Sequence, residues 1–506
     1  QEHYEAYDGV ADLYVYFYEL ALNLLRPGGR LGFIVTNKWM RAGYGEPLRR
    51  LLGKSAWVES VVDFGHAKQI FPDADVFPSI LVARKPADGS QQEVPRVCAI
   101  PREQLRVDDL SRQIEAEGFP IPRARLGAEP WSLEPPGVAE LMEKIRRTGL
   151  PLREFAGVAP LYGIKTGFNE AFLMDTPTKE RLVAADPKSA DLFRPYLRGQ
   201  DVKRWCAEWT GLWMLAMKSS ANHLWPWAEA GEKADAVFQA TYPAIHAHLS
   251  EYRRQLTQRQ DQGQYWWELR ACAYWDQFDK PKIMYQDIAW QPRFCLDVAG
   301  TLSNNTVYFL PTNDLWVLAV LNSPVAWWYS WRNAQHGKDE ALRFFAAFME
   351  EFPVPRVAEG SRQKVEAAVR RLTDITAGQH ETRRAFLDWL RVEFGVEKPT
   401  QRLQDLVALD ADGLIREVKK ARGRSRPLSV VDVKRLREEH VRSIAPVQAL
   451  AAETLQLEQR VSDLVNAAYG LTPEEVALLW RTAPPRMPTD PPDDTGQPGS
   501  SGGASG

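Results

Sequence analysis

The chain has 506 residues, of which 44% are hydrophobic and 25% charged, a composition that excludes a disordered or fibrous protein and suits several folded domains. Its net charge of −3 gives no global sign of nucleic-acid binding, although a basic stripe on one face would be enough for it. No apolar run approaches the roughly 18 residues that span a bilayer, and four widely separated cysteines favour a reducing cytoplasm over a disulfide framework.

The first predicted elements lie between residues 12 and 85. Apolar side chains at helical spacing predict a helix from Asp12 to Leu25, which the following Pro-Gly-Gly turn ends. The continuously apolar run Leu31 to Val35 is typical of a strand buried on both faces of a parallel sheet. A helix around residues 44–52 and the strand-like runs VESVVDF and PSILVARK follow. This order predicts a doubly wound α/β domain, in which ligands bind beyond the carboxyl ends of the strands.

The remaining chain changes character several times. A charged, proline-punctuated connector with a short helix at Val138 to Arg147 precedes a mixed α/β domain rich in aromatic and polar side chains, which suit a recognition surface. In that domain KIMYQDIAW, RFCLDVAG and NNTVYFL predict strands, and Leu315 to Trp331 predicts one helix. Long charged helices and a Pro/Gly/Ser-rich disordered tail follow. The predicted divisions are 1–90, 91–150 (connector), 151–356 (mixed domain), 357–482 (helical) and 483–506 (tail).

The loop between the two strand-like runs is the first candidate functional segment. It reads FGHAKQIFPDADVF and carries Phe71 at its centre. An aromatic side chain at such a loop tip can stack on a planar ligand, since loops held by a scaffold often carry function. The alternative is that Phe71 and Phe77 simply plug the core.

Together these motifs resemble the γ-class, TaqI-type adenine-N6 DNA methyltransferases found in type IIG restriction–modification and phage-defence proteins. The catalytic-domain resemblance rests on the DLYVYF helix, the PGGRLGFIV strand, the IFP loop and the PSILVARK strand. AGYGEPLRRLL is similar to the segment that follows the PGG strand. The stretches GIKTGFNEAFLMD, PYLRGQDVKRW, SNNTVYFL and LAVLNSPVAWW resemble the target-recognition domain, and AAYGLTPEEVALL resembles the C-terminal end.

The resemblance implies a base-flipping enzyme that uses S-adenosyl-L-methionine, because adenine N6 cannot be reached inside the stack. It implies that Phe71 stacks on the flipped adenine and that Asp12 and Tyr14 line the far side of the cofactor and base pocket. The family's Gly-rich loop and Asn-Pro-Pro-Tyr motif, which precede the first helix, do not occur in this sequence. We therefore expect a truncation before Gln1, a cofactor held mainly by the missing N-terminal segment, and a chain that is inactive alone.

Polar residues of the second domain are candidates for contacts with duplex DNA. Arg, Lys, Gln and Asn side chains read base edges or hold phosphates, although each could instead lie in a solvated loop. A basic stretch from Ala411 to Arg442, with twice as many Lys and Arg as Asp and Glu, either holds the DNA backbone or forms a solvated helix face. The predicted DNA-binding residues are Lys165, Thr166, Asn169, Arg198, Gln200, Lys203, Gln286 and Arg293.

The sequence thus predicts an adenine-specific DNA methyltransferase represented by its base-holding half, its recognition domain and a helical region. The main alternative is a non-catalytic DNA-recognition subunit that works with a separate methylating chain. A third alternative, a small-molecule or RNA methyltransferase, would not need the long aromatic recognition domain.

Overall fold

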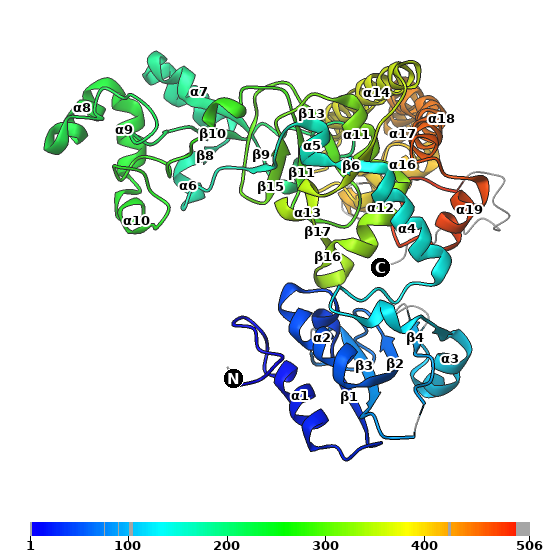
Figure 1. Ribbon diagram of the computed structural model, residues 1–506. Helices are drawn as coiled ribbons and strands as arrows, with labels where there is room; N and C mark the ends of the chain where they lie inside the picture. Colours follow the sequence, from blue (N-terminus) through cyan, green and yellow to red (C-terminus); the bar gives the residue numbers. More distant parts are fainter. Residues whose placement is uncertain (1–2, 75, 90, 101–104, 424–426, 492–506) are drawn as a thin grey trace. The chain divides into compact units, whose positions relative to one another are not determined.

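The computed structural model describes residues 3–74, 76–89, 91–100, 105–423 and 427–491. Its residues fall into two compact units (Figure 1): unit 1 contains 1–144 and 336–341, and unit 2 contains 145–335 and 342–506. Within the described part of the chain, no helix combines the length and apolarity needed to cross a membrane.

Unit 1 is built on a five-stranded sheet in the order β1-β3-β2-β4-β5. Strand β3 is antiparallel to both β1 and β2, so these two run parallel to each other and end at the same edge of the sheet. The elements are α1 (Tyr14–Leu24), β1 (Arg30–Thr36), α2 (Glu46–Ser55), β2 (Trp57–Asp63), β3 (Pro78–Arg84), β4 (Arg96–Ala99), α3 (Leu110–Glu117) and β5 (Phe119–Pro120).

The α/β class and the order of these elements are confirmed, but the environment of the first strand is not the one predicted. Strand β1 is antiparallel to β3 and is the end strand of the sheet as described. Its Ile34 side chain is 44% exposed. An apolar run signals a strand, and its length alone cannot distinguish a central position from an edge.

Helix α1 is present as predicted, yet much of its predicted apolar stripe faces solvent. Val15, Tyr18 and Leu22 pack into the core of unit 1. Phe17 and Leu24, by contrast, are 55% and 78% exposed, and Leu13 and Leu20 on the same face are exposed as well. The helix therefore has two apolar faces, of which the described residues cover one.

Residues 91–150 differ from the predicted connector. Strand β4 pairs in parallel with β2, and β5 pairs with β4. Trp131 is buried against Trp39, with ring centroids 5.0 Å apart. The part of this segment up to Leu133 thus completes the sheet and core of unit 1, because two short strands satisfy their backbone groups there despite the many prolines. The predicted helix is confirmed as α4 (Pro136–Thr148).

Unit 2 contains two four-stranded sheets, ordered β14-β9-β10-β8 and β13-β11-β15-β7. Three strands predicted from sequence correspond to β11, β13 and β15. The strands of unit 2 are β6 (Gly149–Pro151), β7 (Leu161–Tyr162), β8 (Leu173–Met174), β9 (Phe193–Leu197), β10 (Trp213–Leu215), β11 (Lys282–Gln286), β12 (Ile288–Ala289), β13 (Phe294–Asp297), β14 (Leu302–Ser303), β15 (Val307–Leu310), β17 (Leu342–Arg343) and β18 (Pro353–Pro355). Strand β16 (Gln335–His336) spans the boundary between the units.

Short helices surround these sheets, and one helix prediction was wrong at its centre. The span Leu315 to Trp331 forms two helices because Asn322 bonds both backbone groups of Phe294, at 3.1 and 2.9 Å, and Ser323 caps the second helix. The helices are α5 (Leu152–Ala156), α6 (Asn169–Phe172), α7 (Thr176–Ala185), α8 (Ala234–Thr241), α9 (Pro243–Ser250), α10 (Arg253–Gln258), α11 (Leu315–Leu321), α12 (Pro324–Asn333) and α13 (Ala346–Glu350).

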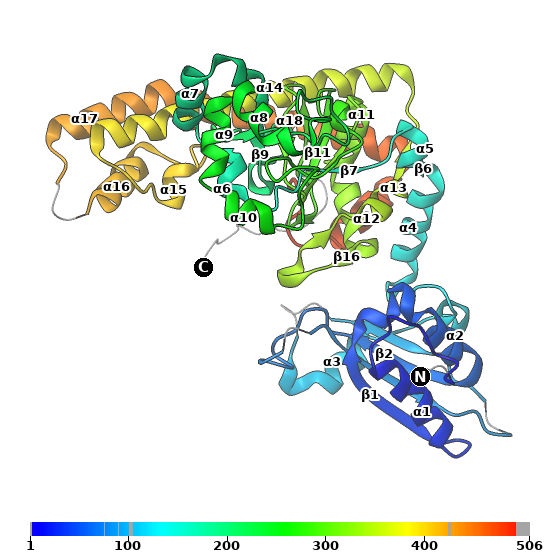
Figure 2. The same ribbon diagram turned by 90° about the vertical axis from the view of Figure 1, so that its left-hand side faces the viewer.

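The predicted long helices are confirmed in the C-terminal part of unit 2. Helix α17 continues through a π-helical turn into α18, and this continuous stretch runs antiparallel to α14. Arg371 of α14 pairs with Glu453 of α18, while Glu393 further along α14 pairs with Arg435 of α17. Figure 2 shows α15, α16 and α17 gathered at one end of this pair. The elements are α14 (Glu359–Phe394), α15 (Gln401–Gln404), α16 (Ala411–Arg422), α17 (Val430–Glu439), a π-helical turn (His440–Ile444), α18 (Ala445–Ala468) and α19 (Pro473–Arg481).

The gathered end, which we call the helical tip, has its own apolar cluster. Phe386, Leu390 and Leu414 are among its buried members, which span residues 386–447. The start of the predicted disordered tail is held in place, because the carbonyls of Pro485 and Pro488 accept hydrogen bonds from Trp327 and Arg204. Residues 492–506 of that tail lie outside the described residues, as do 424–426 of the basic stretch.

Candidate nucleic-acid interface

In unit 1, polar groups gather where β1 and β2 end. Asn37 follows β1, and its Nδ2 donates to Asp63 Oδ1 at the end of β2 over 2.8 Å. The Asn37 backbone N–H also donates to the Phe77 carbonyl over 2.7 Å, and Gly65 N–H donates to Asp63 Oδ1 over 3.0 Å. Both ends of the loop that carries Phe71 are therefore fixed to this edge. The Phe71 side chain itself is 38% exposed, which leaves its ring available for stacking.

Asp12 and Tyr14 lie at the start of α1. Asp12 is exposed, whereas the Tyr14 hydroxyl lies 2.9 Å from the Tyr44 hydroxyl. Burial, reinforced by that hydrogen bond, raises the pKa of Tyr14, so its phenol stays neutral. An exposed carboxylate and a neutral hydroxyl pair are groups that can hydrogen-bond the amine and ribose hydroxyls of S-adenosyl-L-methionine, the cofactor expected from the sequence. No group of three potential metal ligands occurs among the described residues of either unit.

In unit 2, three of the predicted DNA-binding residues lie in the turn that leads into α6, and two of them bond each other. Lys165 Nζ lies 2.7 Å from Asp261 Oδ2. Thr166 is buried, and its hydroxyl donates to Asn169 Oδ1 over 2.6 Å. Asn169 is exposed at the start of α6. The turn is thus preorganised, with Lys165 and Asn169 facing solvent and Thr166 positioned as a support.

The other predicted residues meet around the loop that follows β9. Gln286 is buried, and its Nε2 donates to the Gly199 carbonyl. Arg198 bonds Asp201 through Nε at 3.1 Å and Nη2 at 3.2 Å. Gln286 and Arg198 therefore stabilise the loop that follows β9, which carries Gln200 and Lys203. Whether any of the eight residues contacts DNA stays a prediction.

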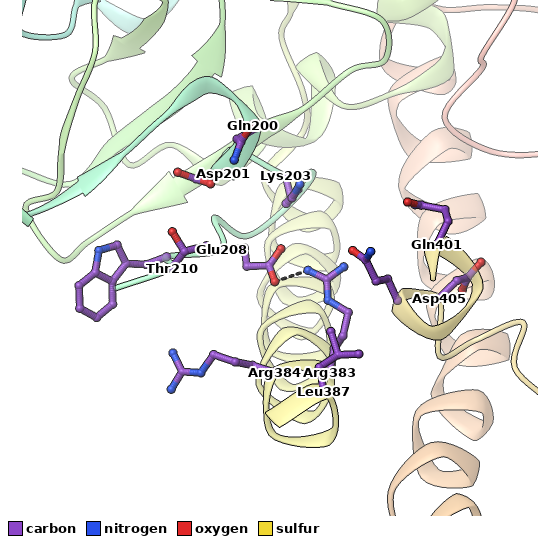
Figure 3. Close-up of a pocket in the computed structure, with 12 residues that line it drawn as sticks. Gln200, Asp201, Lys203, Glu208, Thr210, Arg383, Arg384, Leu387, Gln401 and Asp405 are labelled. Carbon is purple, nitrogen blue, oxygen red and sulfur yellow. Dashed lines mark hydrogen bonds and ion pairs between the residues drawn. The ribbon is translucent and has the colours of Figure 1, made fainter. Parts of the chain in front are cut away.

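Gln200 and Lys203 line a cleft of about 870 Å³ between this loop and the helical tip. Figure 3 shows Glu208 and Arg383 facing each other across it and joined by an ion pair. Polar groups dominate the lining, as in a groove for a hydrated, charged partner. The lining residues are Gln200, Asp201, Lys203, Glu208, Trp209, Thr210, Arg383, Arg384, Leu387, Gln401, Gln404 and Asp405.

Lys203 is the most unusual cation of the cleft. Burial lowers the pKa of its ammonium, and the positive charges of Arg293 and Arg383 lower that pKa further. The carboxylate of Glu208 has the opposite effect but does not cancel the shift. Among the described residues, neither Lys203 nor Arg384 has a hydrogen-bond or ion-pair partner. Cations crowded together in this way favour an incoming anion, which relieves their mutual repulsion.

Glu208 is the group that holds this cationic cluster together. Burial opposes its ionisation, yet the hydrogen bond and charge of Arg383 keep the pKa of Glu208 below its usual value. His380 lies one turn before Arg384 on α14, and its Nδ1 is buried without a hydrogen-bond partner. Burial lowers the pKa of His380, with the charge of Glu208 opposing that shift and the charges of Arg383 and Lys203 adding to it.

No local signal in the sequence marks the helical side of the cleft. Arg383 and Arg384 stand in a charged helical pattern, where single cations are usually solvated. Their role depends on a contact with Glu208, 175 residues away in the chain, and no local pattern predicts such a distant pairing.

Three family models match parts of the chain. Residues 1–71 match the Eco57I restriction-modification methylase, residues 194–354 the TaqI-like C-terminal specificity domain, and residues 358–465 a domain of unknown function, DUF8810. The third match covers the helical wall of the cleft.

Curated relatives are bacterial methyltransferases. The chain is 27% identical over 371 residues to the type II methyltransferase M.XhoI of Xanthomonas vasicola, covering 68% of this chain and 62% of that protein. It is also 27% identical over 388 residues to the type II methyltransferase M.PaeR7I of Pseudomonas aeruginosa, covering 71% of this chain and again 62% of the relative. The chain thus spans less than two thirds of the length of these relatives.

Among solved structures, the type IIL restriction-modification enzyme MmeI in complex with DNA superposes with a TM-score of 0.49 at 15% identity, covering 94% of this chain and 52% of that one. That likeness is too distant to assign roles to residues. The family models and curated relatives confirm the resemblance to TaqI-like restriction–modification methyltransferases predicted from the sequence.

Proposed function

We propose that this chain, whose methylase and specificity regions match TaqI-like restriction–modification proteins, is the specificity-bearing part of a site-specific DNA methyltransferase. The observation that carries the proposal is the order of the two matches along one chain, with the methylase region at 1–71 and the specificity domain at 194–354. The complete enzyme transfers a methyl group to adenine N6 in duplex DNA. S-adenosyl-L-methionine supplies that methyl group when bound.

The residues of unit 1 hold the target base. Because N6 is inaccessible inside the stack, the adenine must leave the duplex before it reacts. Phe71 then stacks on its face from a loop that Asn37 and Asp63 fix to the sheet edge. A fixed loop makes this stacking effective, since little conformational freedom is lost when the base arrives. Asp12 and Tyr14 border the cofactor.

A second protein segment completes the methylase domain. Strand β1 has no strand partner on one side among the described residues of unit 1, and edge strands of this kind readily accept another strand. Beside it, the exposed face of α1 carries Leu13, Phe17, Leu20 and Leu24. An exposed apolar face next to an open sheet edge favours a partner that adds both a strand and an apolar cover. We infer that this partner is the cofactor-binding N-terminal segment.

Co-expression with the segment encoded upstream, in bacteria without their own adenine methylation, tests the proposal. Mass spectrometry of nucleosides from the host DNA should reveal N6-methyladenine, and sequencing of the methylated sites should reveal one short motif. The Phe71→Ala variant should abolish the methylation while leaving the proteins associated. The Phe17→Glu variant should instead prevent the association, which co-purification measures.

Two outcomes would change the assignment. Methylation of cytosine in place of adenine would contradict the adenine specificity but not the enzyme class. Sequence-specific DNA binding together with methylation that is insensitive to Phe71→Ala would favour the alternative of a recognition subunit, in which another chain holds the base.

A further inference from the structure

We propose that the helical region of unknown function, residues 358–465, is a clamp that binds the phosphate backbone of duplex DNA across the cleft from the specificity domain. Here Lys203 contributes from the specificity side, and Arg383 and Arg384 contribute from α14. This inference rests on the proposed function, because it takes duplex DNA as the ligand.

The first argument is the placement of the cations. Lys203 and Arg384 lie on opposite walls of one open groove, and neither has a partner among the described residues. Arg293 is close enough to add its charge to that of Lys203. The lining also holds the carboxylates of Asp201, Glu208 and Asp405, of which Asp201 pairs with Arg198 and Glu208 with Arg383. Unpaired cations on both walls suit a polyanion that passes between them, whereas an isolated surface cation does not need a second wall.

The second argument is the state of Arg383. Its guanidinium is half-buried and is occupied by Glu208, a carboxylate from the facing wall. Carboxylate and phosphate oxygens make the same bidentate hydrogen bonds with arginine. Glu208 therefore stands in for a phosphate when the cleft is empty, and DNA competes with it for Arg383. The ion pair joins the two walls of the cleft.

The third argument distinguishes the cleft from the rival basic surface. The stretch from Ala411 to Arg442 has more cations, but several of them are paired: Arg422 lies 3.9 Å from Asp432, Arg435 lies 2.6 Å from Glu393 and Arg437 lies 3.1 Å from Asp412. Binding of DNA to paired cations releases fewer counterions, so that stretch should contribute less to DNA affinity than its number of Lys and Arg residues suggests.

The salt dependence of DNA binding tests the clamp. The 506-residue chain is titrated onto a fluorescent duplex at several salt concentrations, and the slope of log Kd against log salt is measured. The double variant Lys203→Gln/Arg384→Gln should weaken binding and reduce the slope by about 0.9 for each phosphate that is no longer neutralised. The loss of affinity should be the same for two duplexes of unrelated sequence, because contacts with phosphates carry no sequence information.

Two further double variants remove the same charge elsewhere. Lys364→Gln/Arg370→Gln changes exposed residues of α14 far from the cleft lining and should leave the slope unchanged. Lys419→Gln/Lys420→Gln tests the rival surface on α16. The clamp is overturned if this third pair alone reduces the slope, or if all three pairs reduce it equally.

Glu208→Gln gives a result of opposite sign. Removing this carboxylate frees Arg383 for phosphate, so binding should tighten several-fold and the slope should steepen, which a merely damaged fold would not produce. Unchanged or weaker binding by a folded Glu208→Gln variant contradicts the clamp. If the unsubstituted chain binds no duplex at all, the clamp and the proposed function fail together. If it binds but the cleft variants match it, only the clamp fails.

Discussion

The two walls of the cleft are stabilised in different ways. On the specificity side, a buried polar network runs through an aromatic core: Glu268 is fully buried and accepts a hydrogen bond from Trp227, which belongs to that core. On the helical side, the tip is held by an apolar cluster of its own. A hydrogen-bonded network fixes the orientation of its side chains, whereas apolar contacts mainly keep side chains close together. The wall that we propose to read bases is therefore held by directional contacts. The wall that we propose to hold phosphates needs only to lie near the DNA backbone.

Removing the centre of the specificity network should have the largest effect. Glu268 accepts hydrogen bonds from the Ser220 and Gln264 backbones at 3.0 and 2.9 Å and from Trp227 Nε1 at 2.9 Å. Glu268→Ala leaves the buried Trp227 N–H and two partly buried backbone N–H groups unpaired, which costs about 3 to 5 kcal/mol of unfolding free energy. Urea denaturation followed by tryptophan fluorescence measures the decrease. The exposed Glu229→Ala serves as the control and should stay within about 0.5 kcal/mol.

Truncating the core of the helical tip should cost less and act locally. Leu390 is fully buried in the cluster of the tip. Leu390→Ala should destabilise it by about 2 to 4 kcal/mol, because apolar burial is removed and a cavity remains. Hydrogen exchange should rise in residues 386–447 and remain unchanged in β9 to β11. Equal exchange in both walls would show that they unfold as one unit and would remove the contrast between them.

Elements were easier to predict from the sequence than their environments were. Helix α14 and strand β11 followed from periodicity, because local spacing encodes them. The exposed side of α1 and the edge position of β1 could not be predicted from the sequence. An apolar pattern indicates a face that can be buried, but it does not identify the residues that cover that face. The sequence did not predict the cleft. Gln200 and Lys203 were candidates because they lie next to a glycine turn, while Glu208 and Arg383 needed the tertiary fold to bring them together.

A smaller, stabilising effect is expected at Gly378 in the middle of α14. A methyl group there would meet no heavy atom within 4 Å, and its backbone is helical. Gly378→Ala should therefore stabilise the chain by roughly 0.5 to 1 kcal/mol, because glycine loses more backbone entropy in a helix. Gly360→Ala, in the first turn of the same helix, should gain less since helix ends fray. Thermal denaturation compares the two variants. A decrease in stability at Gly378 would indicate that α14 bends there.

The smallest effect concerns the pH dependence of the cleft. The lowered pKa of His380 means that the folded chain favours the neutral imidazole, mainly because of burial. Its contribution to stability is therefore complete above the unfolded pKa of about 6.5 and is lost as the pH falls through the lower folded value. The groups that face it are Glu208, Arg383 and Lys203.

Urea denaturation of the chain and of His380→Asn between neutral and mildly acidic pH measures this contribution. The unsubstituted chain should lose more stability on acidification than the variant does. The difference should grow in a Glu208→Gln background, because the Glu208 carboxylate is the one neighbouring group that favours the imidazolium. A difference that shrinks in that background would mean that His380 is charged in the folded cleft, and it would place another positive charge beside the proposed phosphate.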